Sequence, residues 1–266
     1  MSLVSLKFLI FLTTDWQLKT GGNRGIGLAL SQAVAEAGSQ VAIIYRSATD
    51  ADQIASKLSK QYNVPVKAFQ CDVTDQEKVK SVVKKINEEF GPVTGLVANA
   101  GVAELRPALE LTRADFDKIY NVNVYGVFNT CQAVAQNWVD RKFDKGSIVI
   151  VSSMSGHIYN QSAPNKALTQ VFYNSSKAAV THLGKCLAGE WAQHKIRVNI
   201  ISPGYVNTDQ TKDHPQEIKD YQCNTTPLGR FSEPLEQAGQ AVFLLSDKAS
   251  YITGTDVLID GGFHIW

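Results

Sequence analysis

Short apolar runs alternate with helix-length amphipathic stretches along most of this chain. Clear examples are residues 41–45 and 148–151, each too short for an average helix. A continuous apolar run of that length fits a strand whose two faces are both buried in a parallel sheet. Because the strands alternate with helices, the helices cross over and cover both faces. The sequence therefore predicts an α/β fold with a doubly wound (Rossmann-type) parallel sheet of about seven strands.

The expected elements follow one another without a linker, a repeat or a change of composition. Strands are expected at 41–45, 66–71, 96–98, 148–151, 196–201 and 257–259, and helices at 27–37, 50–62, 75–90, 113–138, 173–191 and 234–246. Residues 205–235 are polar, contain three prolines and predict an irregular lid over a substrate. We expect residues 20–266 to form one domain and residues 1–19 to form an irregular N-terminal segment.

The strand that should precede the first helix has two interpretations. Residues 8–12 are apolar but end well before Gly21, whereas residues 16–20 lead directly into it but include Lys19. An unpaired buried lysine would be costly. Either residues 8–12 supply the first strand and 13–19 loop out, or residues 16–20 form a compromised strand. A signal peptide is not expected, because the apolar run is short and no small-residue cleavage pattern follows it.

Charge and cysteine content exclude several classes of protein. Lys plus Arg total 26 and Asp plus Glu total 25, so neither nucleic acid nor an anionic membrane is expected as the main partner. The four cysteines are far apart and form no CxxC pair, which indicates reduced thiols in a cytoplasmic protein. The five histidines show no metal-ligand spacing, and no segment is long enough to span a membrane. No metal is therefore expected.

A glycine cluster precedes the first expected helix. Residues 20–27 read Thr-Gly-Gly-Asn-Arg-Gly-Ile-Gly. Glycines allow a tight turn and a close approach of the backbone to a phosphate, and the start of the helix offers free N–H groups. A lone cluster of this kind is weak evidence, but it becomes stronger between a strand and a helix. We expect it to bind the phosphates of a dinucleotide.

The residues after the second and third strands indicate which dinucleotide. An acidic residue after the second strand would hold a ribose 2′-hydroxyl, whereas an arginine accepts a 2′-phosphate. Here Arg46 follows that strand and Arg24 lies in the glycine cluster, which favours NADP over NAD. Asp72 after the third strand either accepts a hydrogen bond from the adenine or caps the next helix. Small residues at 99–101 leave room for a flat ring or ribose.

Candidate acid/base chemistry lies in residues 146–187. Tyr173 and Lys177 lie four residues apart and point the same way on a helix. An ammonium stabilises a phenolate and lowers the phenol pKa from about 10, although such a pair is common on helices and weak evidence alone. Ser152 and Ser153 end the strand at 148–151, at the sheet edge where ligands bind. Asn123, inside a buried helix, either bonds the core backbone or holds a functional water.

Taken together, these motifs resemble those of the short-chain dehydrogenases/reductases. The matching stretches cover residues 20–266 and are 20–27, 99–101, Asn123, Ser153, 173–177 and 203–204. The resemblance implies that Tyr173 is the acid/base and that Lys177 lowers its pKa and holds the nicotinamide ribose. It implies that Ser153 orients the substrate oxygen and that Asn123 positions a water that relays protons. Ser155 and Ser162 are rival serines, but Ser153 directly ends the strand.

The resemblance also implies a set of cofactor contacts, although each of these residue types is common in loops. The residues expected to contact NADP(H) are Gly21, Asn23, Arg24, Ile26, Gly27, Arg46, Ser47, Asp72, Val73, Asn99, Ala100, Gly101, Tyr173, Lys177, Pro203, Gly204, Val206 and Thr208.

Within the family, the chain is most similar to the fungal NADP-dependent mannitol 2-dehydrogenases, on the stretches 21–27, 44–47, 168–177, 202–211 and 259–262. This implies hydride transfer between NADP(H) and C2 of a sugar, D-fructose to D-mannitol in reduction, by a homotetramer. The alternatives are another ketose (sorbose or xylulose) or a small ketone. The polar loops at 154–172 and 205–226 favour a hydroxylated substrate. A hypothesis of another class is a catalytically weak NADP-binding sensor or scaffold, supported only by the irregular strand before Gly21.

Overall fold

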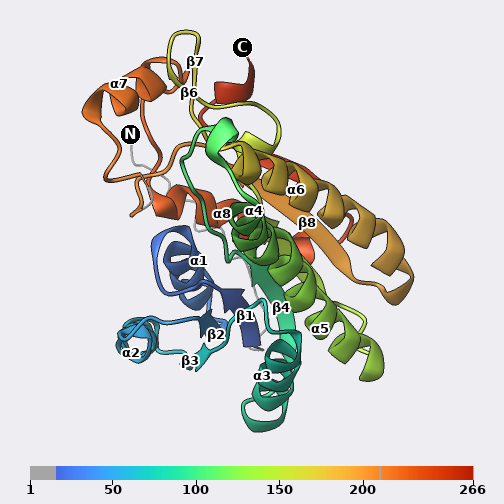
Figure 1. The fold of residues 1–266 in the computed structure, drawn as a ribbon. Coiled ribbons are helices and arrows are strands. Elements are labelled where there is room, and N and C mark those ends of the chain that lie inside the picture. Colours follow the sequence, from blue (N-terminus) through green and yellow to red (C-terminus); the bar gives the residue numbers. More distant parts are fainter. Residues whose placement is uncertain (1–15, 210, 266) are drawn as a thin grey trace.

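The structure is a computed structural model of the 266-residue chain, and it describes residues 16–209 and 211–265. Within these residues, one parallel sheet has the strand order β3-β2-β1-β4-β5-β8-β9 (Figure 1). This sheet confirms the predicted α/β, doubly wound fold. The strand order reverses between β1 and β4, and open α/β sheets bind ligands at the carboxyl ends of strands beside such a switch point.

The bounds of the elements agree with most of the expected ranges. The strands of the sheet are β1 (Trp16–Thr20), β2 (Gln40–Tyr45), β3 (Val66–Gln70), β4 (Val93–Ala98), β5 (Ser147–Val151), β8 (Arg197–Pro203) and β9 (Asp256–Ile259). The helices are α1 (Gly25–Glu36), α2 (Ala51–Tyr62), α3 (Gln76–Glu89), α4 (Arg113–Tyr120), α5 (Val127–Asp140), α6 (Val171–Trp191), α7 (Gln216–Asn224) and α8 (Ala238–Leu245).

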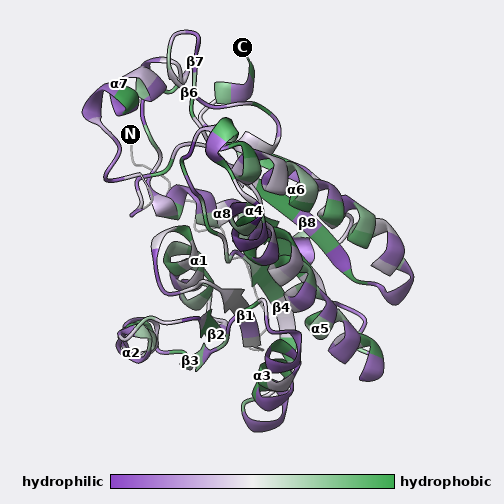
Figure 2. Cartoon of the chain, in the orientation of Figure 1, coloured by the Kyte–Doolittle hydropathy of each residue, from purple (hydrophilic) through white to green (hydrophobic). Residues whose placement is uncertain are grey.

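Both faces of the sheet are covered, as the apolar runs predict. Successive strand residues enter opposite cores: Ile148 packs with residues of α3, α5 and α6, and Val149 packs with residues of α1, α2 and α8. Figure 2 shows apolar residues along the strands and polar residues on the outer sides of the helices. No helix of the described residues is long and apolar enough to cross a membrane.

The strand before the glycine cluster forms from residues 16–20, the second of the two interpretations. β1 pairs in parallel with both β2 and β4, while residues 8–12 and the side chain of Lys19 lie outside what the structure describes. The polar Gln17 is buried there, and its Nε2 donates to Thr94 Oγ1 at 3.0 Å. The side chain occupies the space that a Cβ on Gly95 would need. Partners on β4 thus allow a polar residue in a central strand.

Two predictions about the helices were wrong in detail. The single helix expected at 113–138 is divided into α4 and α5 by a π-helical turn, Asn121–Gly126. An extra residue in a helix shifts the phase of the pattern that follows it, but this stretch is apolar on several sides, so the shift does not show in the periodicity. The helix expected at 234–246 begins as a 3₁₀ turn, Pro234–Gln237, before α8.

The expected irregular lid at 205–235 contains a helix, α7. The helix begins after Pro215, whose fixed φ suits a helix start. A short hairpin of β6 (Gln161–Ala163) and β7 (Lys166–Ala167), which was not expected, lies between β5 and α6. Figure 1 shows α7 and this hairpin together at one end of the molecule.

The packing of α6 on the sheet yields a test with an internal control. A Cβ on Gly184 would lie 2.8 Å from Ile200 Cγ1 and 3.2 Å from Ile150 Cδ1, whereas Gly189 has nothing within 4 Å. We expect Gly184→Ala to destabilise the protein by about 1–3 kcal/mol through overpacking. Gly189→Ala should stabilise it by about 0.5–1 kcal/mol through helix propensity. Urea denaturation measures both, and equal effects would contradict the packing of α6.

Candidate active site

The glycine cluster forms a turn between β1 and α1 in which Gly21 and Gly27 occupy places that do not suit other residues. Gly21 has a φ of +62°, a conformation that favours glycine. A Cβ on Gly27 would collide with the Gly21 carbonyl oxygen and lie 2.5 Å from Asn99 Nδ2. The start of α1 is therefore pressed against the ends of β1 and β4. Its unpaired N–H groups face the same edge of the sheet, where they suit an anion.

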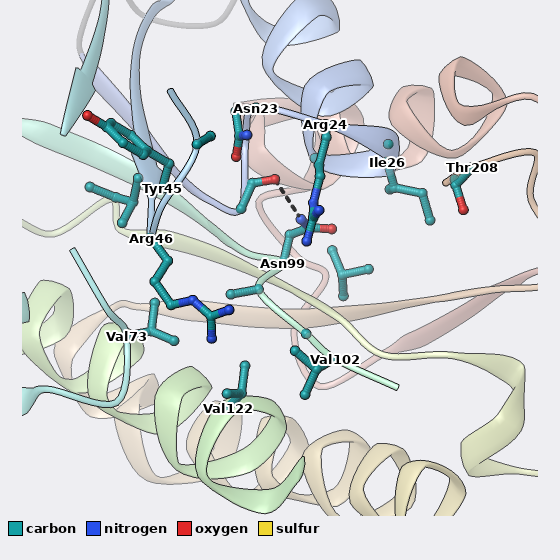
Figure 3. Close-up of a pocket in the computed structure, with 18 of the residues that line it drawn as sticks. Asn23, Arg24, Ile26, Tyr45, Arg46, Val73, Asn99, Val102, Val122 and Thr208 are labelled. Carbon is teal, nitrogen blue, oxygen red and sulfur yellow. Dashed lines mark hydrogen bonds between the residues drawn. The ribbon is translucent and has the colours of Figure 1, made fainter. Parts of the chain in front are cut away.

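A cleft of about 560 Å³ lies over this turn (Figure 3). It brings together fifteen of the eighteen residues expected to contact the cofactor: Gly21, Asn23, Arg24, Ile26, Gly27, Arg46, Ser47, Asp72, Val73, Asn99, Ala100, Gly101, Tyr173, Lys177 and Thr208. The three others lie outside its lining. Pro203 ends β8, Gly204 packs closely against Asp260, and Val206 is buried.

Ten further residues line the cleft that the sequence did not predict as cofactor contacts, although it marked Gly25 in the glycine cluster and Ser152 at the end of a strand. They are Gly25, Ile44, Tyr45, Ala48, Cys71, Val102, Val122, Val151, Ser152 and Asp209. Four of them lie at or directly after the ends of strands and Val122 lies in the π-helical turn, so their place in the fold, rather than a motif, brings them to the cleft.

Two guanidinium groups reach into the cleft from its two sides, as Figure 3 shows for Arg24 and Arg46. Both side chains belong to exposed residues, and neither forms an ion pair with another described residue. Asp72 lines the cleft and accepts hydrogen bonds from the amide and hydroxyl of Thr74. The helix-capping interpretation of Asp72 was wrong, because Asp75 caps α3.

Tyr173 and Lys177 lie one turn apart on α6 and both line the cleft. The Lys177 ammonium donates to the Val151 carbonyl oxygen at 2.9 Å and lies 5.8 Å from the centroid of the tyrosine ring. Ser153 follows β5, and its side chain hydrogen-bonds Tyr173. The rival Ser162 lies in the hairpin and donates to the Lys166 carbonyl oxygen instead. The three residue types that the sequence picked out thus meet at one point.

Burial controls the protonation of this pair. It raises the pKa of Tyr173, and the hydrogen bond with Ser153 partly opposes that rise. Burial also lowers the pKa of Lys177 from 10.5 to about 8. Both groups are therefore shifted toward their uncharged forms. We expected Lys177 to lower the pKa of Tyr173, but the effects that act on this pKa are burial and the hydrogen bond with Ser153.

Asn123 lies in the π-helical turn, is fully buried and does not line the cleft. Its Oδ1 accepts from the Val102 amide at 2.8 Å, and its Nδ2 donates to the Val102 carbonyl oxygen at 2.9 Å. Of the two roles expected for this side chain, bonding of the backbone is the one that the geometry supports.

A second polar cluster joins the hairpin region to the lid. Gln170 Nε2 donates to Asn160 Oδ1 at 2.7 Å, and Asn160 Nδ2 donates to the Tyr205 hydroxyl at 3.3 Å. Burial raises the pKa of Tyr205 to about 12. The Tyr205 ring stacks on Phe231 at 5.2 Å and meets the edge of Phe263 at 5.3 Å. The C-terminal Phe263 therefore packs within its own chain.

Similar proteins have the same architecture. A family model described as enoyl-(acyl carrier protein) reductase matches residues 21–264. The chain is 41% identical over 246 residues to the sorbose reductase of Candida albicans, covering 92% of this chain and 85% of that protein. It is 38% identical over 264 residues to the NADP-dependent mannitol dehydrogenase of Alternaria alternata, covering 99% and 95%. A crystal structure of a short-chain type dehydrogenase/reductase from Mycobacterium marinum has a TM-score of 0.90 and 36% identity, covering 96% and 98%.

This chain belongs to the short-chain dehydrogenases/reductases. The resemblance that its motifs carry is thereby confirmed. Membership accounts for the sheet, the glycine turn and the Tyr173–Lys177 pair as parts of one oxidoreductase architecture. It leaves the roles of individual residues, and the choice of substrate, as proposals.

The buried lysine of this dehydrogenase/reductase yields a prediction with a defined pH dependence. A pKa of about 8 in the folded protein against 10.5 unfolded means that the folded state binds the proton less well. The penalty is therefore complete below about pH 8 and disappears as pH rises toward 10.5. We expect Lys177→Met to raise the stability of the unliganded protein at pH 7, by at most about 3 kcal/mol.

The control is Lys185→Met, which removes an exposed lysine from the same helix and should change stability little. Thermal unfolding between pH 7 and pH 10 measures both variants. A gain for Lys177→Met that does not shrink with rising pH would contradict the assignment.

Proposed function

We propose that this protein is an NADP(H)-dependent oxidoreductase that interconverts a ketose and a polyol, with D-fructose and D-mannitol as the first candidates. The observation that carries the proposal is that Tyr173 and Lys177 line a cleft large enough for a dinucleotide and that Ser153, outside that lining, hydrogen-bonds Tyr173. A hydroxyl, a phenol and an ammonium in this arrangement suit the transfer of a proton to or from an oxygen next to a hydride-accepting carbon.

The residues of the cleft fit a nicotinamide dinucleotide. A side chain at Gly27 would fill the phosphate turn, and the buried Lys177 ammonium has a single hydrogen-bond acceptor, the Val151 carbonyl oxygen, among the described residues. An ammonium has three donors, so two remain for ribose hydroxyls. NADPH, when bound, supplies the hydride. The chain itself supplies the phosphate turn and the ribose contacts, and it positions the ketone oxygen.

Two guanidinium groups support NADP(H) over NAD(H). Arg24 and Arg46 reach into the cleft without a carboxylate partner among the described residues, and a guanidinium suits a 2′-phosphate. The relative from Alternaria alternata is named as NADP-dependent, which supports the same choice.

The acid/base step follows from the protonation of Tyr173. Because burial raises its pKa, the phenol is neutral at pH 7 and can donate a proton to the ketone oxygen in reduction. Ser153 hydrogen-bonds this phenol and is placed to hold the same substrate oxygen. Oxidation of the alcohol needs the phenolate, which a protonated Lys177 stabilises. Neither the hydrogen bond between Ser153 and Tyr173 nor the stabilisation of the phenolate by Lys177 requires the predicted proton relay through Asn123.

The polar surroundings support a hydroxylated substrate. Asn160, Gln170 and Tyr205 form the cluster beside α6, and α7 adds Tyr221, whose hydroxyl donates to Gln161 Oε1 at 2.8 Å. The named activities of two relatives, on sorbose and on mannitol, support a ketose or polyol. Sorbose, xylulose and a small ketone are the alternative substrates. The sensor or scaffold hypothesis loses its only support, because β1 leads directly into the glycine turn.

A panel of ketoses tests the proposal. We expect the protein to consume NADPH with fructose, measured at 340 nm, and to use sorbose or xylulose less well. Tyr173→Phe should lower turnover by roughly 10²–10⁴-fold, because it removes the general acid, while NADPH binding by fluorescence titration stays nearly unchanged. NADPH binding without turnover on any ketose would refute the proposed enzymatic activity.

Cofactor choice is tested at Arg46. Arg46→Asp removes a guanidinium and adds a charge that repels a phosphate, so the preference for NADPH over NADH should fall by roughly tenfold or more. Lys145→Asp makes the same charge change at an exposed position before β5, outside the cleft lining, and is the control. An unchanged ratio of kcat/KM for the two cofactors in Arg46→Asp would remove Arg46 from the 2′-phosphate site.

Assembly as a homotetramer and a cytoplasmic location belong to the same proposal. A mostly apolar groove supports contact between subunits. Its lining residues, from α4, the π-helical turn, α5 and α6, are Tyr120, Asn121, Val124, Tyr125, Phe128 and Leu183. Sedimentation velocity would measure the assembly, and microscopy of a tagged chain would measure the location.

A further inference from the structure

Two neighbouring serines on α6 have different surroundings. Ser175 is exposed, and its hydroxyl bonds only to the carbonyl oxygens of Val171 and Phe172 in its own helix. Ser176 is fully buried between Tyr173 and Lys177 and does not line the cleft. A buried hydroxyl at this place must have partners, and its partners connect the helix to other segments.

The Ser176 hydroxyl joins the catalytic turn of α6 to the π-helical turn. Its Oγ donates to the Tyr173 carbonyl oxygen at 2.7 Å and accepts from Asn123 Nδ2 at 3.0 Å. Asn123 in turn holds both the amide and the carbonyl of Val102. One hydroxyl therefore connects α6, residues 121–126 and the segment after β4.

This connection leaves the Asn123 side chain no spare donor. Its two N–H groups go to Val102 and Ser176, and its oxygen accepts from Val102. The position of a Cβ on Gly101 lies 3.5 Å from Asn123 Oδ1 and 3.6 Å from Lys177 Nζ. The amide and the ammonium thus face the same small residue of the cleft. A shift of Asn123 would move Val102, to which it is bonded, and with it Gly101, which lies beside the Lys177 ammonium.

We propose that Ser176 is a positioning residue for the acid/base pair and that it acts through Asn123. It holds the π-helical turn at a fixed distance from the turn of α6 that carries Tyr173 and Lys177. This inference rests on the proposed function, because its effect appears in turnover. It should affect kcat more than cofactor binding, because Ser176 contacts no residue of the phosphate turn among the described residues, whereas it bonds the turn of α6 that carries Tyr173.

The first test compares Ser176→Ala with Ser175→Ala in NADPH-dependent reduction of the best ketose. Removing one buried hydrogen bond that aligns the site should lower kcat about five- to tenfold in Ser176→Ala. The KM for the ketose and the Kd for NADPH should change less than twofold, and Ser175→Ala should match the wild type. If Ser176→Ala does not fold, Ser176→Cys fills the same space with a weaker hydrogen-bonding group and should show the same loss of kcat.

The second test asks whether Ser176 acts through Asn123. If it does, adding Ser176→Ala to Asn123→Ala should lower kcat no further than Asn123→Ala alone. If Ser176 acted independently of Asn123, the factors by which the two single substitutions lower kcat would multiply in the double variant. Equal kcat for Ser176→Ala and Ser175→Ala, or multiplied losses in the double variant, would overturn the proposal. Absence of turnover by the wild type on every ketose would instead refute the proposed function itself.

Discussion

The whole cleft depends on the close contact between the end of β1 and the end of β4. The Thr20 hydroxyl accepts from the amides of Asn99 and Ala100 at 2.8 and 3.0 Å, and Asn99 Nδ2 donates back to the Thr20 carbonyl oxygen at 3.1 Å. These bonds hold two neighbouring strands together at the point where the sheet order reverses. Because α1 starts on one of them, the brace also fixes the direction in which the helix N-terminus faces. Any widening here would separate the phosphate turn from the acid/base pair on α6.

Electrostatics and binding are coupled at this site. Burial raises the pKa of Tyr173 and lowers that of Lys177 to about 8, so the unliganded protein favours a neutral phenol. That form donates protons well and accepts them poorly. Negative phosphates in the cleft would favour the charged lysine, and a charged lysine favours the phenolate. Proton donation, the step that reduction requires, can therefore start from the protonation state that burial favours.

The sequence predicted the elements whose signal is local. The strand at 148–151 is a continuous apolar run, and the glycine cluster stands between a strand and a helix, so both could be predicted without the fold. The structure adds the reasons for two glycines, a positive φ at Gly21 and a backbone contact that excludes a Cβ at Gly27. β1 could not be decided without the fold, because Gln17 is tolerated only through Thr94 and the space over Gly95, which lie 77 and 78 residues away. The π-helical turn around Asn123 was not predicted, because the stretch is apolar on several sides and the phase shift of an inserted residue does not show in it. The sequence does not distinguish Ser175 from Ser176. The fold exposes Ser175 and buries Ser176 between segments that its hydroxyl connects.

The polar cluster beside α6 is built from several segments of the chain, and this is the physical reason why the sequence leaves several candidate ketoses open. Asn160, Gln170 and Tyr205 use their polar atoms on one another, and Gln161 is bonded by Tyr221 and Gln222 of α7. The positions of these groups therefore depend on how the hairpin and α7 close together. Tyr205, with a pKa of about 12, stays a neutral hydroxyl that both donates and accepts. A hydroxylated substrate can exchange hydrogen bonds with such a cluster, whereas an apolar ketone would leave displaced amides unpaired, at about 1–3 kcal/mol each. Under the proposed function, this chemistry would disfavour an apolar ketone, and the spacing within the cluster would distinguish one sugar from another.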